Sequence, residues 1–266
     1  MAGWGLEYDV GVFVAITRAV SPAFASCELT QLERVPIDVD RARAQHHAYE
    51  QALVAAGGLV QQLDTSADMP DSVFVEDIAV VFPEMAIITR PGADSRRAET
   101  PAIAHALAAF RSLRAIQPPG TVDGGDVLVA GRRVFVGLST RTNDAAVAQM
   151  RRILGPHGYT VCATDVTGCL HLKSAVTALD DTTLLVNRAW IDPAAFAGFT
   201  LVDMDPDEPS AANALRLDDR VIVPAAFPRT AQLLERRGLN VMLVDADELA
   251  KAEGAVTCCS LIIGGR

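Results

Sequence analysis

The sequence has little that would cross-link the chain, hold a structural metal or anchor it in a membrane. Its 266 residues include five cysteines, an odd number, with no CxxC pair and no cysteine–histidine spacing of zinc type. These absences argue against a disulfide framework and a zinc domain, and free thiols favour a reducing compartment, which we expect to be the cytoplasm. No apolar run approaches the roughly 18 residues that a membrane span needs, so we expect no membrane partner.

Positive charge is also scarce. The 33 acidic and 23 basic side chains leave a net charge of −10, which argues against a nucleic-acid partner and would suit a small cationic substrate. Because half of the residues are hydrophobic, the chain can bury a core of ordinary size without disulfides or metals. No basic leader precedes the apolar run from Val10 to Ile16, which predicts a strand and not a secretory signal.

No linker rich in Pro, Gly or Ser divides the chain, which instead carries an internal repeat. From Asp77 the sequence predicts a strand, a tight turn at residues 83–85, a second strand, a polar break and a helix. The same order returns from Asp126, Ser174 and Ala214, and each helix is followed by a short apolar strand. With an incomplete first copy, whose hairpin is shared with the C-terminal strand CCSLIIGG, there are five units of strand, strand, helix and strand.

Five such units predict a closed ring. We expect a single-domain α/β protein over residues 1–266, a five-bladed α/β propeller of ββαβ units whose first strands surround a central cavity. The residue that opens each unit should face that cavity. These residues are separated by 46, 48, 42 and 45 positions and are Asp77, Asp123, His171, Asn213 and Cys258.

The thiol and the imidazole of this set are the usual pair for nucleophilic catalysis, since a thiolate attacks while a histidine handles protons. A lone buried cysteine is more often an inert small hydrophobe. Cys258, however, opens a repeat opposite His171 and two carboxylates, which favours a functional thiol. Cys259 should point to the other face of the same strand and pack in the core.

The two carboxylates, Asp77 and Asp123, do not fit a protease, whose oxyanion hole supplies donors. They fit a planar guanidinium, whose N–H groups pair with carboxylates in a way that would orient its central carbon toward the sulfur. The alternative is that each aspartate caps a turn or a helix, as we expect of Asp126. The pair Gly124-Gly125 carries no phosphate-binding signal by itself.

Two arginines, Arg96 and Arg141, follow the second strands of consecutive units, where loops on the rim carry function. They are candidates for holding a substrate carboxylate. The alternative is a pair of solvated rim charges.

Five stretches, in order and spanning most of the chain, resemble the dimethylarginine dimethylaminohydrolase family, guanidino-group-modifying enzymes with the fivefold pentein fold. They are PDSVFVEDIAVV (70–81), ITRPGADSRRAE (88–99), VDGGDVLVAGRRVFVGLSTRTN (122–143), LHLKSA (170–175) and VTCCSLII (256–263). The resemblance implies that Cys258 is the nucleophile and His171 the general acid and base, with Asp123 beside them. It further implies substrate contacts from Glu76, Asp77 and Asp123 to the guanidinium, Asp71 near the α-amino end, Phe74 along the aliphatic chain, and Arg96 and Arg141 to the α-carboxylate. A loop at residues 20–36, containing Leu29, is similar to the family's mobile lid.

The implied reaction is hydrolysis of Nω-methylated L-arginine to L-citrulline and methylamine or dimethylamine, through a covalent thiouronium on Cys258. No metal or organic cofactor is expected, because the electrophile arrives already charged. A free thiol has a pKa near 8.5. Thiolate must therefore be generated by the cationic substrate, by His171, or by both.

Other activities of the same fold remain alternatives. An arginine deiminase would carry an extra helical insertion, for which no stretch of this chain is available, and agmatine lacks the carboxylate that Arg96 and Arg141 would hold. A non-catalytic binding protein would not need the converging thiol, imidazole and acids, and a cysteine amidase would leave Asp77 and Asp123 facing a group with too few donors. The sequence leaves both a monomer and a homodimer open.

Overall fold

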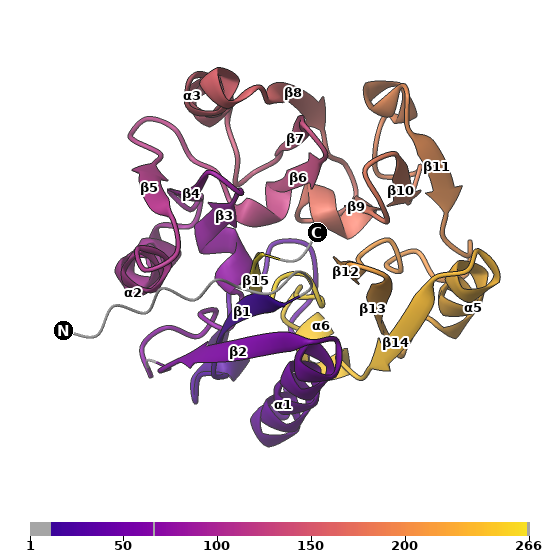
Figure 1. Ribbon diagram of the computed structural model, residues 1–266. Helices are drawn as coiled ribbons and strands as arrows, with labels where there is room; N and C mark the ends of the chain where they lie inside the picture. Colours follow the sequence, from indigo (N-terminus) through magenta and orange to yellow (C-terminus); the bar gives the residue numbers. More distant parts are fainter. Residues whose placement is uncertain (1–11, 66, 265–266) are drawn as a thin grey trace.

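A computed structural model describes residues 12–65 and 67–264 (Figure 1). Five three-stranded sheets stand around a central axis and form the five-bladed α/β propeller that the repeat predicts. The strand predicted at Val10–Ile16 lies partly outside the described residues, and its described part belongs to β1, Phe13–Arg18. Within the described residues, no helix is long and apolar enough to span a membrane.

Each blade has an inner strand, a middle strand and an outer strand. The inner strands are β15 (Leu261–Ile263), β3 (Ala79–Val81), β6 (Val127–Ala130), β9 (Val176–Ala178) and β12 (Leu215–Leu217). The middle strands are β1, β4 (Met85–Ile88), β7 (Arg133–Leu138), β10 (Thr183–Val186) and β13 (Arg220–Pro224). The outer strands are β2 (Gly58–Leu63), β5 (Ser112–Ala115), β8 (Thr160–Asp165), β11 (Thr200–Asp203) and β14 (Asn240–Val244).

Every middle strand pairs antiparallel with its inner neighbour and parallel with its outer neighbour. A tight turn is enough for the first pairing, whereas the second needs a crossover that reverses the chain. The crossovers contain α1 (Val39–Ala55), α2 (Thr100–Leu107), α3 (Asp144–Leu154), the 3-10 helix Pro193–Phe196 and α5 (Pro228–Arg236). Two short helices, α4 (Leu172–Ala175) and α6 (Asp247–Ala250), lie in the loops before β9 and β15.

The alternation of side chains along the middle strands explains why these strands are apolar throughout. In β1, Phe13 and Ala15 join a core cluster with the fifth blade, while Val14 and Ile16 join a cluster with the second. Three further clusters fill the remaining gaps between neighbouring blades. The core is therefore divided into five wedges, and each blade contributes to two of them.

The inner strands surround a channel of about 560 Å³ on the axis of the ring. Val80, Leu128, Thr177, Arg216 and Ile262, one residue from each inner strand, line it. The channel is one of two cavities that bear on function. The other lies where the loops that precede the inner strands converge.

Two local predictions need correction. β15 begins at Leu261, so Cys258 and Cys259 lie in the turn before the strand and not within it. The fourth crossover holds only a four-residue 3-10 helix, which begins with Pro193 and is capped by the Asp192 side chain.

Candidate active site

Four of the five residues that open the units converge on one small cavity. Asp77 lies in a 3-10 helix at Val75–Ile78, Asp123 precedes another at Gly124–Asp126, His171 precedes α4, and Cys258 lies in the turn before β15. All four line a cavity of about 20 Å³. Its other walls are Glu28, Asp71, Phe74, Arg96, Arg141, Leu170, Ala252, Glu253 and Gly254.

The imidazole of His171 lies between two carboxylates. Its Nε2 is 3.1 Å from Asp123 Oδ2, and its Nδ1 is 3.7 Å from Asp77 Oδ1. Burial acts to lower the pKa of His171, but the charge of Asp77 and the hydrogen bond with Asp123 outweigh it and raise the pKa to about 9. The ring is therefore protonated at neutral pH and can donate a proton to a leaving group.

Asp77 and Asp123 each accept one backbone N–H from another loop. The Gly125 N–H donates to Asp77 Oδ1 at 3.1 Å, and the Gly92 N–H donates to Asp123 Oδ1 at 2.8 Å. Neither side chain caps the 3-10 helix that it lies in or precedes, so both aspartates are cavity acids and not helix caps. Burial works to raise the pKa of Asp77, yet the positive charges of His171 and Arg96 hold it below its ordinary value.

Gly124 and Gly125 are explained by the close approach of neighbouring groups to their backbone, without any need for a phosphate. A Cβ on Gly125 would lie 2.5 Å from His171 Nδ1, and one on Gly124 would lie 1.9 Å from the Glu76 carbonyl oxygen. Any larger residue would therefore displace the imidazole or the loop that carries Asp77.

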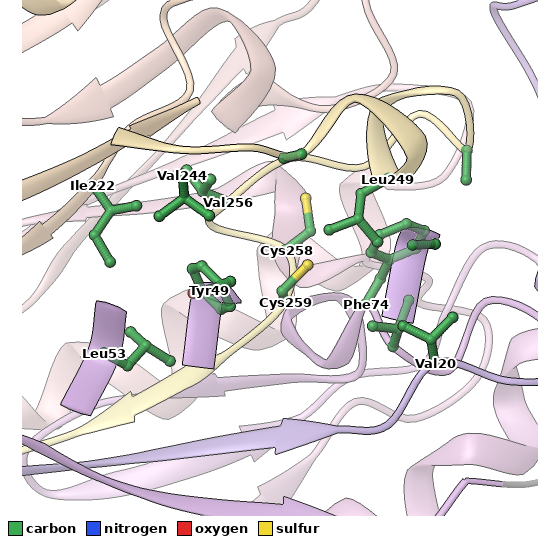
Figure 2. Packing of buried hydrophobic residues seen from close by; sticks show 14 of the residues in the cluster. Val20, Tyr49, Leu53, Phe74, Ile222, Val244, Leu249, Val256, Cys258 and Cys259 are labelled. Carbon is green, nitrogen blue, oxygen red and sulfur yellow. The ribbon is translucent and has the colours of Figure 1, made fainter. Parts of the chain in front are cut away.

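The Cys258 thiol is buried and lies close to acids. Burial is the largest cause that raises its pKa, followed by the charges of Glu76 and Asp77, and the pKa reaches about 12. The free protein therefore holds a neutral thiol. Cys259 is fully buried in the cluster that joins the first and fifth blades, so it packs in the core as predicted, although from a turn (Figure 2).

The two candidate arginines occupy different environments. Arg96 is buried in the wall, where it donates to both carboxylate oxygens of Glu99, to Asp77 Oδ2 and to the backbone carbonyls of Asp71 and Phe74. Arg141 reaches the mouth of the cavity, and its Nη2 donates to Thr30 Oγ1 at 2.8 Å. Arg96 thus orients Asp77, while Arg141 faces the loop at residues 20–36.

The remaining predicted contacts lie on one side of the cavity. Asp71 accepts the backbone N–H of Glu28 at 3.1 Å, and burial raises its pKa to about 6 against the opposing charge of Arg96. The Phe74 ring packs edge-on against Phe24 and closes on Gly254, where a Cβ would lie 2.1 Å from it. Leu29 is half-buried against the same core cluster (Figure 2 shows Phe74 within it).

Glu76 faces the axial channel and does not line the small cavity. Its Oε1 lies 2.5 Å from Lys173 Nζ, and its Oε2 accepts the Thr257 hydroxyl at 2.8 Å. Asn213, the remaining unit-opening residue, donates to the Lys173 carbonyl and the Thr257 hydroxyl. A contact of Glu76 to a guanidinium stays a prediction, and Asn213 ties the supporting loops together.

Sequence reasoning missed one supporting group, Lys173, and part of the role of another, Asp126. Lys173 stands two positions after His171, and its position within LHLKSA was the only available signal. Asp126 accepts the hydroxyls of Ser139 and Thr142 at 2.6 Å each and caps α4 through the Leu172 N–H at 2.9 Å. The expected capping by Asp126 is confirmed, but the capped helix belongs to the next blade. Asp126 lies before β6 of the third blade, and it holds the first turn of α4, which follows His171 in the fourth.

A cation could in principle be held by Asp77, Asp123 and His171, whose ligand atoms all lie within 4.8 Å of one another. The Arg96 guanidinium already neutralises Asp77, and the proton on His171 opposes a metal ion. The donor set therefore suits an organic cation with N–H groups better than a metal.

A five-bladed propeller with a thiol, an imidazole and acids at the starts of its blades defines the pentein class of guanidino-group-modifying enzymes. The family model described as "N,N dimethylarginine dimethylhydrolase, eukaryotic" matches residues 29–192. The chain belongs to the dimethylarginine dimethylaminohydrolase family.

Relatives agree with this assignment. An N(G),N(G)-dimethylarginine dimethylaminohydrolase of Streptomyces coelicolor is 44% identical over 249 residues, which are 93% of this chain and 95% of the relative. The enzyme of the same name from Pseudomonas aeruginosa is 37% identical over 84% of this chain and 89% of its own. A solved structure of the P. aeruginosa protein, a cysteine-to-serine variant complexed with citrulline, superposes with a TM-score of 0.89 at 34% identity and covers 94% of this chain and 98% of that one.

The fold extends to more distant proteins. The N-terminal domain of a cyanobacterial arginine dihydrolase superposes with a TM-score of 0.81 at 17% identity, over 95% of this chain and 98% of that one. At that identity the likeness shows the fold alone.

Proposed function

We propose that the protein hydrolyses Nω-methylated L-arginine to L-citrulline and methylamine or dimethylamine. The observation that carries this proposal is the cavity lined by both the Cys258 thiol and an imidazolium that two carboxylates hold. Carboxylates that neutralise one cation can accept the N–H groups of another. The names and bound ligands of the similar proteins support the same reaction.

Substrate binding activates the nucleophile in this mechanism. The guanidinium enters beside Cys258, where its positive charge offsets those of Glu76 and Asp77 that keep the thiol neutral. The pKa of the thiol falls, its proton leaves to solvent, and the thiolate adds to the central carbon. This assigns the activation chiefly to the substrate, because His171 already carries its proton.

His171 completes both halves of the reaction. Its imidazolium gives a proton to the substituted nitrogen, the C–N bond breaks, and the free amine leaves a positively charged thiouronium on Cys258. The neutral imidazole then takes a proton from water as the oxygen adds to the same carbon. The C–S bond breaks, the added hydroxyl releases its proton to solvent as the urea carbonyl forms, citrulline is released and the thiolate is restored.

The other end of the substrate meets the mouth of the cavity. In this proposal Arg141 exchanges Thr30 for the α-carboxylate, and the Asp71 carboxylate accepts an N–H of the α-amino group. Arg96 already donates to Glu99, Asp77 and two backbone carbonyls, so its contact to the α-carboxylate stays a prediction. A carboxylated substrate therefore suits the site better than agmatine. A reducing compartment such as the cytoplasm stays our prediction, since the Cys258 thiol must remain free.

The test offers the purified protein asymmetric dimethylarginine, monomethylarginine, arginine and agmatine separately, and measures citrulline or carbamoylputrescine. We expect the two methylated arginines to have the highest kcat/KM, with dimethylamine or methylamine formed in equal amount to citrulline. Arginine as the best substrate would make the protein a deiminase. No product from any of the four would favour a non-catalytic binding protein.

A further inference from the structure

The small cavity is closed by the loop at residues 20–36, which we call the lid segment. Glu28 of this loop lines the cavity, whose volume of about 20 Å³ holds about one water molecule. An arginine derivative is many times larger. The lid segment must therefore move before substrate enters, and the groups that hold it closed affect substrate affinity.

Three polar contacts hold the lid segment to the second and third blades and to the loop before them. Arg141 donates to Thr30 Oγ1, Ser95 Oγ donates to Glu28 Oε1 at 2.7 Å, and the Glu28 N–H donates to Asp71. Two of these partners, Arg141 and Asp71, are the groups that the substrate's own carboxylate and amino group would engage. When substrate binds Arg141 and Asp71, it therefore competes with two of these three contacts that hold the lid segment closed.

Further contacts come from the segment that follows α6, where Lys251 Nζ donates to the Pro36 carbonyl at 3.2 Å. The carboxylate of Glu253 accepts the backbone N–H groups of three consecutive lid residues: Thr30 at 3.0 Å, Gln31 at 2.5 Å and Leu32 at 2.6 Å. Successive backbone N–H groups that converge on one anion form a strong, directional site. Because the Leu32 side chain is 51% exposed, apolar burial adds little to the closure at this point.

Glu253 is itself fixed to the loop that carries the nucleophile. It follows α6, its N–H donates to the Ala250 carbonyl at 3.0 Å, and its φ of 60° places it in the left-handed region, which non-glycine residues rarely adopt. The next residue, Gly254, packs under the Phe74 ring. Five positions separate Glu253 from Cys258.

We propose that Glu253 is a positioning residue that latches the lid segment over bound substrate and ties its closed position to the Cys258 loop. Its three contacts are to backbone N–H groups and involve neither Arg141 nor Asp71, so, like the Ser95–Glu28 hydrogen bond, they need not be exchanged when substrate arrives. The proposal rests on the proposed function for its kinetic consequence, but its structural consequence can be measured in the free protein.

Hydrogen exchange of the full-length free protein tests the latch without any substrate. Glu253→Gln keeps the size of the side chain and removes its charge. We expect amides 30–32 to exchange about tenfold faster in this variant, the loss expected when charge-assisted hydrogen bonds weaken. Glu33→Gln is the matched control, since it removes a lid carboxylate that makes no hydrogen bond or ion pair among the described residues, and amides 30–32 should exchange as in the unaltered protein.

Kinetics then test the positioning role. Glu253→Gln should raise KM for dimethylarginine about tenfold and change kcat less than threefold, because the latch stabilises bound substrate and transition state alike. Glu253→Asp should recover part of the loss, and Glu235→Gln, on the exposed face of α5, should have no effect.

Unchanged exchange at residues 30–32 in both Glu253→Gln and Glu253→Ala would overturn the latch. Faster exchange with unchanged KM would overturn its role in substrate binding. Failure of every variant and of the unaltered protein to turn over methylarginines would refute the proposed function but leave the exchange result standing.

Discussion

The small cavity and the axial channel are built from the same three loops, whose neighbouring residues turn to opposite sides. Asp77, His171 and Cys258 line the cavity, while Glu76, Lys173 and Thr257 line the channel. The cavity side holds about 20 Å³ and the channel side about 560 Å³. The same three loops thus line two compartments of very different volume.

The residues on the cavity side can act on a substrate, whereas those on the channel side support the loops that carry them. On the cavity side the thiol, the imidazolium and the acids line a space that the proposed substrate cation would enter, so their charges would respond to its arrival. On the channel side Glu76, Lys173 and Thr257 satisfy one another. A buried ion pair of this kind adds little net stability, but removal of one partner leaves the other charge uncompensated.

The largest effect should come from the thiol on the cavity side. Cys258→Ser should lower kcat by about ten thousandfold or more, because a hydroxyl at this position is not ionised by a nearby cation. Cys259→Ser, one position on and in the core, should keep most of the activity. Steady-state kinetics with dimethylarginine, together with urea unfolding, distinguish lost chemistry from lost folding. The reverse pattern would show that the nucleophile has been assigned to the wrong sulfur.

Adjacent carboxylates give the second test of the two sides. Asp77→Asn should lower kcat/KM about a thousandfold, since it removes the charge that faces both His171 and the substrate. Glu76→Gln should lower kcat/KM by about tenfold at most, because the Glu76 carboxylate faces the channel and pairs with Lys173 instead of with the cavity groups.

Glu76→Gln also leaves the Lys173 ammonium without its carboxylate partner, so urea unfolding should show a loss of about 3 kcal/mol for this variant. Asp77→Asn should cost less stability, because Arg96 keeps Glu99 and His171 keeps Asp123. Pairing Glu76→Gln with Lys173→Met should recover part of the loss seen for Glu76→Gln, as a double-mutant cycle would reveal. Equal kinetic losses for Asp77→Asn and Glu76→Gln would mean that both acids contact the guanidinium, as the family resemblance implies.

The convergence of the candidate catalytic groups was predictable because it depends on a long-range period. A repeat of about 45 residues brings equivalent positions to one axis whatever the details of each loop, and so it located Asp77, Asp123, His171 and Cys258. The middle strands were predictable because both of their faces are buried against neighbouring blades, which makes their sequences apolar throughout.

The direction of individual side chains was not predictable. Glu76 and Asp77 lie in a 3-10 turn, and Cys258 and Cys259 in a turn before β15, where no strand alternation decides which way a residue points. Arg96 is six residues beyond the bridge at Arg90, and its inward course depends on Glu99 and Asp77, which only the fold brings together. The Glu253 latch was equally hidden, because its partners are backbone groups more than 220 positions away.

The smallest expected effect concerns the pH dependence of stability on the cavity side. The pKa of His171 is raised from 6.5 to about 9 in the folded protein, mainly by Asp77 and Asp123 acting against burial. Between these two values the folded state binds a proton that the unfolded chain does not. The contribution, on the order of 3 kcal/mol, is therefore fully present below about pH 6.5 and lost as pH rises through about 9. Urea unfolding at pH 6, 7.5 and 9.5 should show a steeper loss for the unaltered protein than for His171→Gln, which cannot titrate. Parallel loss in both proteins would mean that the imidazole is neutral between the two carboxylates, and the proton for the leaving amine would then have to come from elsewhere.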